Sequence, residues 1–154
     1  MGKEQRMKIA LGCDHGGFEA KEVVKKELEK NGFNVLDFGT FSNDSCDYPV
    51  FAFAAAESVA KGESDKGILI CSSGEGVCIC ANKVKGIRCG VGYNDEVSHL
   101  IVEHNHANMI SFGANFMSTT DIIRRIHLFL EAVPFEGRHE RRVALIIQHE
   151  EKNK

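Results

Sequence analysis

The sequence lacks several features that would place it in a special class of protein. No stretch approaches the roughly 18 consecutive apolar residues of a membrane-spanning helix. Basic residues are not in excess, because 19 lysines and arginines are outnumbered by 22 acidic residues, for a net charge of −3. Nucleic acids and anionic membranes attract proteins with a positive field, so neither is an expected partner.

A secretory signal and a paired metal-binding motif are also missing. The segment Met1–Met7 is polar and leads directly into the short apolar run Ile9–Leu11. We therefore expect a cytoplasmic protein whose six cysteines remain thiols. A structural zinc site usually needs two matched pairs of ligands, and Cys78-x-Cys80 has no second pair, so no metal site is predicted.

The chain has the composition and length of one globular domain. It has 154 residues, of which 43% are hydrophobic and 27% charged, and we expect a single domain over residues 1–154. Short apolar runs alternate with segments of helical periodicity. Strands are predicted over 8–13, 34–38, 67–71, 87–91 and 109–112. Helices are predicted over 18–28, 50–61 and 77–83. A fourth helix should begin at Asn94 or Asp95, a fifth should run from a Thr120 cap to 133, and a last one should have its apolar face at 143–147. Both chain ends, up to residue 7 and from residue 150, are expected to be loose.

This alternation predicts an α/β fold. Parallel neighbouring strands need crossover helices, so five strands that are each followed by a helix indicate a three-layer sandwich with a five-stranded parallel, Rossmann-like sheet. Ligands of such sheets bind beyond the carboxyl ends of the strands. The loops after the first, third, and fourth or fifth strands should therefore hold the chemistry.

The loop after the first strand contains Asp14 and His15, flanked by glycines that let a ligand approach the backbone. These two residues are candidates for acid/base chemistry. The simpler interpretation is that Asp14 caps the first helix and His15 is a solvated turn residue.

The loop after the third strand is more informative. Cys71 ends the strand, and Ser72–Gly76 enters a helix amino terminus, where several backbone N–H groups should point outward unpaired and hold an anion. The same donors would favour a thiolate at Cys71, although a buried structural cysteine is an equal alternative. The loop does not match a Walker motif or a dinucleotide fingerprint, and Val77 occupies the place where a cysteine phosphatase would need arginine.

Two further clusters lie later in the chain. His104-Asn105-His106 precedes the last strand and could contact the hydroxyl or carbonyl groups of a sugar. Arg138 and Arg142 are four residues apart, so they would share one helix face, and two guanidinium groups on one face suit phosphate. Taken alone, His-x-His indicates a metal only weakly, and most basic runs like the second are solvated turns near helix ends. In an acidic protein, the combination suggests a small phosphorylated substrate.

In these motifs the sequence resembles the ribose-5-phosphate isomerase B group, which also includes allose- and galactose-6-phosphate isomerases. The resemblance extends from Ile9 to Val143. The matching segments are Gly12-Cys13-Asp14-His15, Asp37-Phe38-Gly39-Thr40, Asp47-Tyr48-Pro49, Cys71 with Ser73-Gly74-x-Gly76, Ala81-Asn82-Lys83, Gly86-Ile87-Arg88, His104-Asn105, and Gly137-Arg138-His139-x-x-Arg142-Val143.

The resemblance implies an aldose–ketose isomerase of the pentose phosphate pathway. Such an enzyme interconverts ribose 5-phosphate and ribulose 5-phosphate through a cis-enediolate, without metal or organic cofactor, in sites shared between two subunits of a homodimer or a dimer of dimers. By the resemblance, Cys71 moves the proton, and Ser73 with the N–H groups of Gly74–Gly76 holds the enediolate oxygens. The other roles it implies are sugar contacts by Asp14, Tyr48 and Ser72, ring opening by His104 with Asn105 beside it, and phosphate binding by His15, Arg138 and Arg142.

The sequence departs from the family pattern at Asn115, where many members have an arginine that contacts phosphate. A six-carbon sugar phosphate therefore stays open as the substrate. Glu75 also places a carboxylate in the anion-binding loop, and Ser72 and His106 replace residues that are more often glycine and aspartate. A sugar-phosphate sensor without turnover is the alternative from another functional class, and a cysteine hydrolase is a third.

Overall fold

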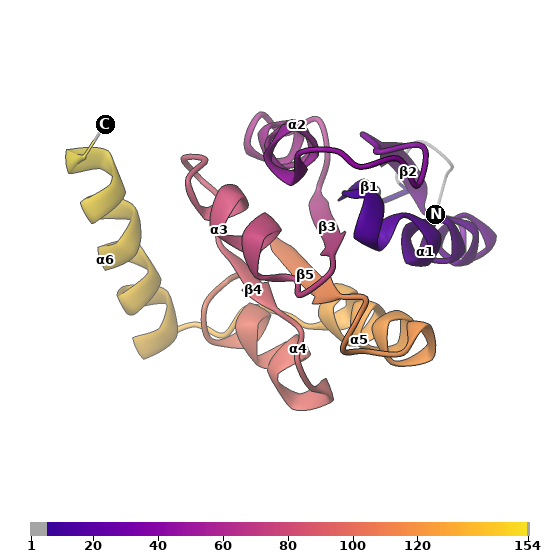
Figure 1. The fold of residues 1–154 in the computed structure, drawn as a ribbon. Coiled ribbons are helices and arrows are strands. Elements are labelled where there is room, and N and C mark those ends of the chain that lie inside the picture. The colour runs from indigo at the N-terminus through magenta and orange to yellow at the C-terminus, as the bar shows by residue number, and fades with distance from the viewer. Residues whose placement is uncertain (1–5, 154) are drawn as a thin grey trace.

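The computed structural model describes residues 6–153, over which the chain forms five strands, six α-helices and a short 3₁₀ turn at His15–Gly17. The strands are β1 (Lys8–Cys13), β2 (Asn34–Asp37), β3 (Lys66–Cys71), β4 (Cys89–Val91) and β5 (Met109–Gly113). The helices are α1 (Phe18–Lys30), α2 (Tyr48–Ala60), α3 (Glu75–Asn82), α4 (Asp95–Glu103), α5 (Thr119–Glu131) and α6 (Arg138–Lys152). Figure 1 shows their arrangement.

All five strands are parallel, in the order β2-β1-β3-β5-β4. The α/β fold predicted from the sequence is thus confirmed. In the register, Cys13 is opposite Ile70, and Cys71 is opposite Gly113. The carboxyl ends of β1, β3 and β5 therefore lie side by side at the centre of one sheet edge.

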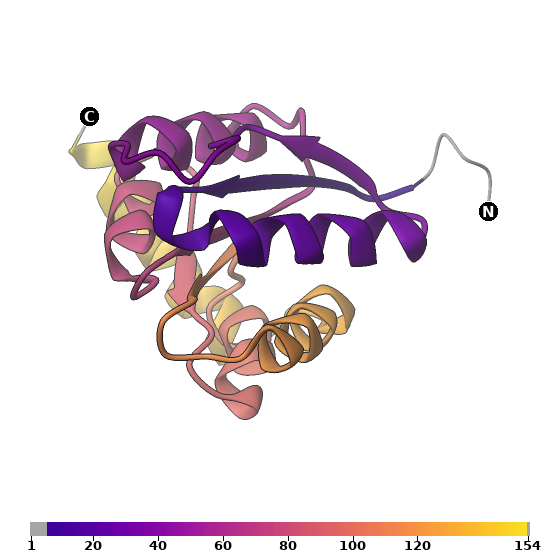
Figure 2. The same ribbon diagram turned by 45° about the vertical axis from the view of Figure 1, so that its right-hand side comes forward.

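Helices cover both faces of the sheet because neighbouring residues of a strand point to opposite sides. Ile68 and Ile70 of β3 pack in one core with α1 and α5, whereas Leu69 packs in a second core with α2 and α3. Figure 2 shows β1 and β2 running between α2 on one side and α1 on the other. In the second core, helix α2 contributes the small side chains Ala52, Ala55 and Ala56. These alanines let α2 approach the sheet closely.

Several element boundaries differ from those predicted. Helix α3 begins at Glu75, directly after Gly74, which has a left-handed φ of +84°. Gly76 lies within the helix, where the ring of Tyr48 occupies the place of a Cβ. Helix α5 is capped by Ser118, whose hydroxyl oxygen accepts from the N–H of Asp121 at 3.1 Å. The cap therefore lies two residues before the Thr120 cap that the sequence predicted. Strand β4 begins at Cys89. The prediction of a cap at Asn94 is confirmed by its bond from the Val97 N–H, 2.7 Å long.

The carboxyl-terminal segment is more ordered than expected. Helix α6 extends to Lys152, and its end is held by the Glu150 carboxylate, which accepts from the N–H of Gly86 at 3.0 Å, and by a Lys85–Glu151 ion pair of 2.9 Å. The expectation of a loose chain end is therefore wrong over residues 150–152. At the amino end, the corresponding expectation for residues 1–5 lies outside the described residues.

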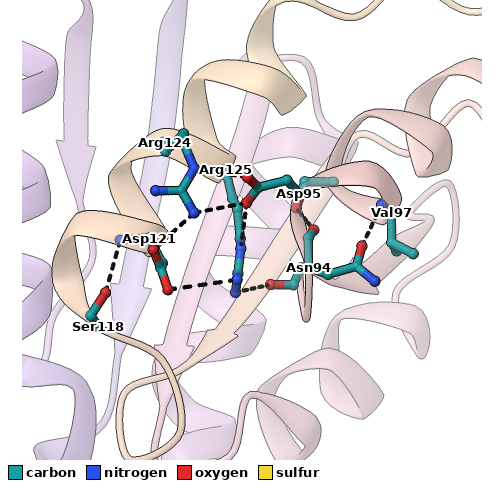
Figure 3. A network of polar contacts seen from close by, with 9 residues as sticks. Asn94, Asp95, Val97, Ser118, Asp121, Arg124 and Arg125 are labelled. Atoms are coloured by element: carbon teal, nitrogen blue, oxygen red, sulfur yellow. Dashed lines mark hydrogen bonds and ion pairs between the residues drawn. The ribbon is translucent and has the colours of Figure 1, made fainter.

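An ionic network joins the amino ends of α4 and α5 (Figure 3). Asp95 receives both a forked contact from Arg124, at 2.9 and 3.0 Å, and a bond of 3.1 Å from Arg125. Asp121 contacts the same two arginines, and Arg125 also donates to the carbonyl of Gly92, which follows β4. These contacts fix the loop after β4 against α5. They hold the pKa of Asp95 below its usual value, chiefly through the bonds from Arg124 and Arg125.

Helix α6 lies at the rim of the molecule, beyond α3 and β4 (Figure 1). Val143 is the residue of this helix that is buried, whereas Leu145, Ile146 and Ile147 are each more than two-fifths exposed. Val133 and Phe135, in the preceding loop, are exposed as well. The described part of the chain thus has an uncovered apolar surface along α6. Within residues 6–153, no helix combines the length and apolar character needed to cross a membrane.

Candidate active site

The loops after β1 and β3 meet at the centre of the carboxyl edge of the sheet. The N–H of Asp14 donates to the carbonyl of Ile70 at 3.3 Å, and Gly16 lies directly against the Ser72 hydroxyl. This contact follows from the pairing of β1 with β3, which places the two strand ends side by side. The structure therefore brings together the candidates Asp14, His15, Cys71 and Ser72, as the loop positions predicted.

Cys71 lies at the base of this site. Its Sγ accepts a hydrogen bond of 3.1 Å from the N–H of Gly74, and its side chain and backbone together are 5% exposed. Gly74 caps α3 with φ of +84°, a conformation that favours glycine, and a Cβ there would meet the backbone of Phe112. The amide at the amino end of α3 is thus aimed at the sulfur, which is the donor that a thiolate accepts.

The Ser73 hydroxyl lies at the exposed side of the same loop. Its oxygen accepts from the N–H of Glu75 at 3.2 Å, so its hydrogen remains available to donate. The prediction that the amides of this loop point outward unpaired is therefore wrong for Gly74 and Glu75, whose partners are Cys71 and Ser73. Short polar side chains at a helix start commonly fold back onto these amides. Glu75 is exposed to solvent.

Asp14 has the structural contact that its position suggested. Its Oδ1 accepts from the N–H of Gly17 at 3.1 Å, and the residue is 7% exposed. This bond caps the 3₁₀ turn that leads into α1. The capping role is thus present, and it also holds the carboxylate rigidly beside the Cys71 loop.

His15 is fixed from the other side. Its Nδ1 accepts from the N–H of Cys46 at 3.2 Å. In a neutral imidazole the hydrogen then resides on Nε2, which becomes a donor toward the solvent side of the site. The loop that follows β2 therefore determines which nitrogen of His15 can donate to a ligand.

Two more residues border this half of the site. The ring of Tyr48, at the start of α2, packs on Gly76 of α3. Asn115 is exposed in the loop after β5, and its N–H donates to the carbonyl of Ser72 at 3.0 Å. The position where many family members have arginine thus lies directly beside the Cys71 loop.

The remaining predicted residues form a second cluster at the opposite edge of the sheet. Helix α4 runs from the carboxyl end of β4 back to the amino end of β5, so His104 and Asn105 lie at the amino edge. The chain between α5 and α6 is attached there, because the N–H of Phe135 donates to the carbonyl of Glu103 at 2.9 Å. Helix α6 starts with Arg138, which places Arg138 and Arg142 in the same region. A single chain does not bring this cluster to Cys71.

His139 belongs to this second cluster, and sequence reasoning gave it no role. Its ring stacks on that of His104 with 4.3 Å between centroids and 5° between planes. Loss of contact with water and the nearby His104, Arg138 and Arg142 hold the pKa of His139 below its usual value. The sequence signal that could have indicated a role for His139 was its position directly after Arg138, in the segment that matches the family. The lowered pKa favours a neutral imidazole at His139, which can stack on the ring of His104 without adding a charge.

The side chains of the site are suited to binding anions and moving protons. Within residues 6–153, no group of three or more histidine, cysteine or acidic side chains is arranged to hold a metal ion. Cys71 can accept a proton, and Ser73, the helix start and His15 can donate to oxygen. The arginines and His104 of the other cluster would complete a site for a phosphorylated sugar.

Comparison with known proteins places this arrangement in context. The family model described as Ribose/Galactose Isomerase matches residues 9–146. Ribose-5-phosphate isomerase B of Escherichia coli (strain K12) is 39% identical over 145 residues, which cover 94% of this chain and 97% of that protein.

Two solved structures are similar over nearly their whole length. The ribose-5-phosphate isomerase B of Clostridium thermocellum has a TM-score of 0.94 and 41% identity, with 96% of this chain and 100% of that chain covered. The enzyme of Mycoplasma genitalium, solved with bound ribulose 5-phosphate, has a TM-score of 0.92 and 36% identity, with 95% and 97% covered. The family model, the identity to these relatives and the shared fold show that the chain belongs to the ribose/galactose isomerase family.

Proposed function

We propose that this protein is an aldose–ketose isomerase that interconverts ribose 5-phosphate and ribulose 5-phosphate. The observation that carries the proposal is the Cys71 sulfur at the end of β3, held by the Gly74 N–H at 3.1 Å and bordered by the Ser73 hydroxyl. This arrangement offers a proton acceptor next to donors for a developing oxyanion. The family relatives named ribose-5-phosphate isomerase B support the choice of substrate.

The reaction needs one base to serve two adjacent carbons. Cys71, as a thiolate, takes the proton from C2 of the open-chain aldose, and the electrons of that C–H bond form the C1–C2 double bond. The C1 oxygen then becomes negative, and the Ser73 hydroxyl with the start of α3 stabilises it. The sulfur returns its proton to C1, while the proton of the C2 hydroxyl moves to the C1 oxygen. C2 is then the ketose carbonyl, and the enzyme regains its thiolate.

The phosphate holds the sugar so that C1 and C2 lie against the sulfur. We assign this contact to the Nε2–H of His15 and to Arg138 and Arg142, whose guanidinium groups suit phosphate oxygens. Asp14 and Tyr48 then face the sugar hydroxyls, and His104 with Asn105 assists ring opening. Because the phosphate is remote from the reacting carbons, its binding energy serves to position them.

This assignment requires two chains. Cys71 and Arg138 lie at opposite edges of one sheet, so we infer that the active site forms between the Cys71 half of one chain and the His104 half of a second copy. The exposed apolar face at Leu145–Ile147 of α6 supports such a pairing, because burial of that face is favourable. A homodimer, or a dimer of dimers, would then contain two identical shared sites.

The test is turnover of purified protein on ribose 5-phosphate, followed by the absorbance of ribulose 5-phosphate. We expect conversion by the wild type and a loss of about a hundredfold or more in kcat for Cys71→Ala, since proton transfer by a placed side chain contributes that much. Binding of ribose 5-phosphate with no turnover would instead favour a sugar-phosphate sensor. Release of inorganic phosphate would favour a hydrolase.

A six-carbon sugar phosphate is the second candidate substrate, and Asn115 is the residue that supports it. The backbone N–H of Asn115 bonds to the carbonyl of Ser72, at a position where many relatives have arginine, and the shorter, uncharged side chain would leave more room and less charge near the phosphate. Rates on ribose, allose and galactose phosphates, compared between the wild type and Asn115→Arg, decide this. A higher kcat/KM for a six-carbon substrate, reversed in the variant, would overturn the pentose assignment.

A further inference from the structure

Two cysteines outside the proposed active site lie in contact with each other. Cys78 is on the second turn of α3, and Cys89 is the first residue of β4. The Sγ of Cys78 donates a hydrogen bond of 3.4 Å to the carbonyl oxygen of Cys89, which places the two cysteines next to each other. In the proposed isomerisation neither thiol has a role.

The surrounding groups hold this pair in one arrangement. The side-chain amide of Asn82 donates to the carbonyl of Cys89 at 2.9 Å and to the Sγ of Cys78 at 3.6 Å. Its oxygen accepts from the N–H of Cys89 at 2.8 Å. Asn82 therefore ties the end of α3 to the start of β4, so that both cysteines are fixed relative to each other.

The surroundings shift the pKa values of the two thiols in opposite directions. Hydrogen bonding from Cys89 lowers the pKa of Cys78 to about 7, and the Asn82 amide contributes in the same direction. The pKa of Cys89 is raised well above its usual value by its bond to Cys78 and by burial. The lowered pKa of Cys78 favours its thiolate, the form of a cysteine that attacks an oxidant.

A path for a small oxidant is also present. A cavity of about 350 Å³ lies between α6 and the body of the protein, and it is lined by Asn82, Arg88 and Cys89 among others. Cys89 is partly exposed, whereas Cys78 is buried. A molecule of the size of a peroxide would reach the pair at Cys89, the member that lines this cavity.

We propose that Cys78 and Cys89 form a modification site that peroxide converts into a reversible intramolecular disulfide. The Cys78 thiolate attacks one oxygen of hydrogen peroxide, the O–O bond breaks, and hydroxide leaves and takes up a proton to become water. The sulfur of Cys89 then attacks the sulfenic acid at Cys78, forms the S–S bond, and releases a second water. Two thiols are oxidised and one peroxide is reduced to two waters.

The pair lies directly behind the loop that contains Cys71. The hydroxyl of Ser111 contacts both thiols and donates to the carbonyl of Gly74 at 2.8 Å. Gly74 is the residue whose N–H holds the Cys71 sulfur. The modification site is thus separated from the proposed active-site loop by a single side chain.

Peptide mapping of the folded wild-type protein tests the proposal without reference to its activity. The protein is treated with hydrogen peroxide, the remaining thiols are blocked with iodoacetamide, and trypsin is added. Cleavage after Lys83 and Arg88 places Cys78 in peptide 67–83 and Cys89 in peptide 89–124. We expect these peptides to be joined, lighter than the two thiol peptides by two hydrogens, and separated again by dithiothreitol.

Peptide 67–83 also contains Cys71 and Cys80, so the fragmentation spectrum must locate the linked sulfur at residue 78. Cys80→Ser is the matched control on the same helix and should keep the link, whereas Cys78→Ser and Cys89→Ser should each lose it. Alkylation of both Cys78 and Cys89 after peroxide treatment would overturn the proposal. A link that persists in Cys78→Ser, or Cys78 found as a sulfinic acid beside an alkylated Cys89, would do the same.

Discussion

The chemistry proposed here depends on individual side chains whose properties differ although their residue types are the same. All six cysteines are free, yet their surroundings are distinct. Cys13, at the end of β1, is fully buried, and burial raises the pKa of its thiol to about 12. Cys71, at the equivalent end of β3, instead accepts an amide hydrogen bond from a helix start. Reactivity is therefore decided by position, and residue type alone does not reveal it.

This difference predicts the outcome of alkylation with iodoacetamide. We expect Cys71 to be alkylated with loss of isomerase activity, and substrate to slow the reaction, because the sugar phosphate would cover the sulfur. Cys13 should stay unlabelled in the folded protein at neutral pH. Labelled sites are identified by peptide mapping at several times. Equal rates at Cys71 with and without ribose 5-phosphate would contradict a reactive thiol in the substrate pocket.

A second residue-scale feature is the buried lysine of α1. Lys21 is 0% exposed, and its ammonium donates to Asp37 at 2.8 and 2.9 Å and to the carbonyl of Thr40 at 2.7 Å. These bonds hold the loop that leads from β2 toward Cys46 and His15. The ion pair thus anchors the loop that orients a proposed phosphate ligand.

Lys21→Met should reduce the free energy of unfolding by about 3–5 kcal/mol, because it leaves the carboxylate of Asp37 buried without its main partner. Urea denaturation measures the change. The double variant Lys21→Met/Asp37→Leu removes both charges and should lose less stability than the single variant. A double variant as unstable as Lys21→Met would show that the charge of Asp37 is not the cause.

Among the elements, α3 determines the shape of the site. Its start is set by Gly74, where φ is +84° and a Cβ would meet the backbone of Phe112. An alanine at residue 74 must therefore move the loop away from β5, and with it the amide that contacts Cys71. Gly32, at the end of α1, provides a matched comparison, since its φ is +89° and nothing lies within 4 Å of the position of a Cβ.

We expect Gly74→Ala to lower kcat by about tenfold or more, as loss of a placed donor does, while the protein remains folded. Gly32→Ala should lose about 1 kcal/mol of stability from the unfavourable φ and keep its kcat. Circular dichroism and turnover of both variants test this. Similar kcat values for Gly74→Ala and the wild type would show that the loop geometry is not needed for turnover.

The network between α4 and α5 predicts a dependence of stability on pH. The pKa of Asp95 is lower in the folded protein than its usual value near 3.8. Its ionised form therefore stabilises the fold above that usual value, and the contribution is lost as the pH falls through the lowered one. Asp95→Asn should denature at a lower urea concentration than the wild type at pH 7, and the two midpoints should converge in acid, below the lowered pKa of Asp95. A difference that persists in acid would contradict the ionic origin.

At the scale of the whole molecule, the main consequence is that one chain contains two separate halves of the proposed site. Mixing inactive variants tests whether two chains complete it. In a heterodimer of Cys71→Ala and His104→Ala, one of the two shared sites would combine an intact Cys71 with an intact His104. After co-refolding or subunit exchange, random pairing should restore about a quarter of the wild-type activity.

Each variant alone is the control for that experiment, and both should remain inactive. Size-exclusion chromatography with light scattering shows whether the mixed chains associate. Association without any recovered activity would contradict a site shared between subunits. A Leu145→Asp variant on the exposed face of α6 should weaken association and activity together, because it places a charge in the proposed interface.

The sequence by itself was sufficient for the fold class and for the strand-end loops in which the candidate residues lie. Alternating strand and helix patterns are local, and the loops at strand ends were recognisable because Cys71, Asp14 and His15 directly follow apolar runs. The start of α3 was misplaced by two residues, because glycine usually marks a loop, whereas Gly76 lies within the helix, where the ring of Tyr48 occupies the place of a Cβ. Such a contact between distant segments has no local signature.

The tertiary structure decided what lies next to what. It set the strand order, placed Asn115 against Ser72, and put Cys78 beside Cys89. It also separated Cys71 from His104, although both belong to the same set of motifs. Strand pairing and helix crossover join segments that are far apart in the chain, and their free energy comes from burial and hydrogen bonds formed only in the folded protein. Periodicity along the sequence reports which face of an element is apolar, whereas the partner of that face is fixed only when the elements pack.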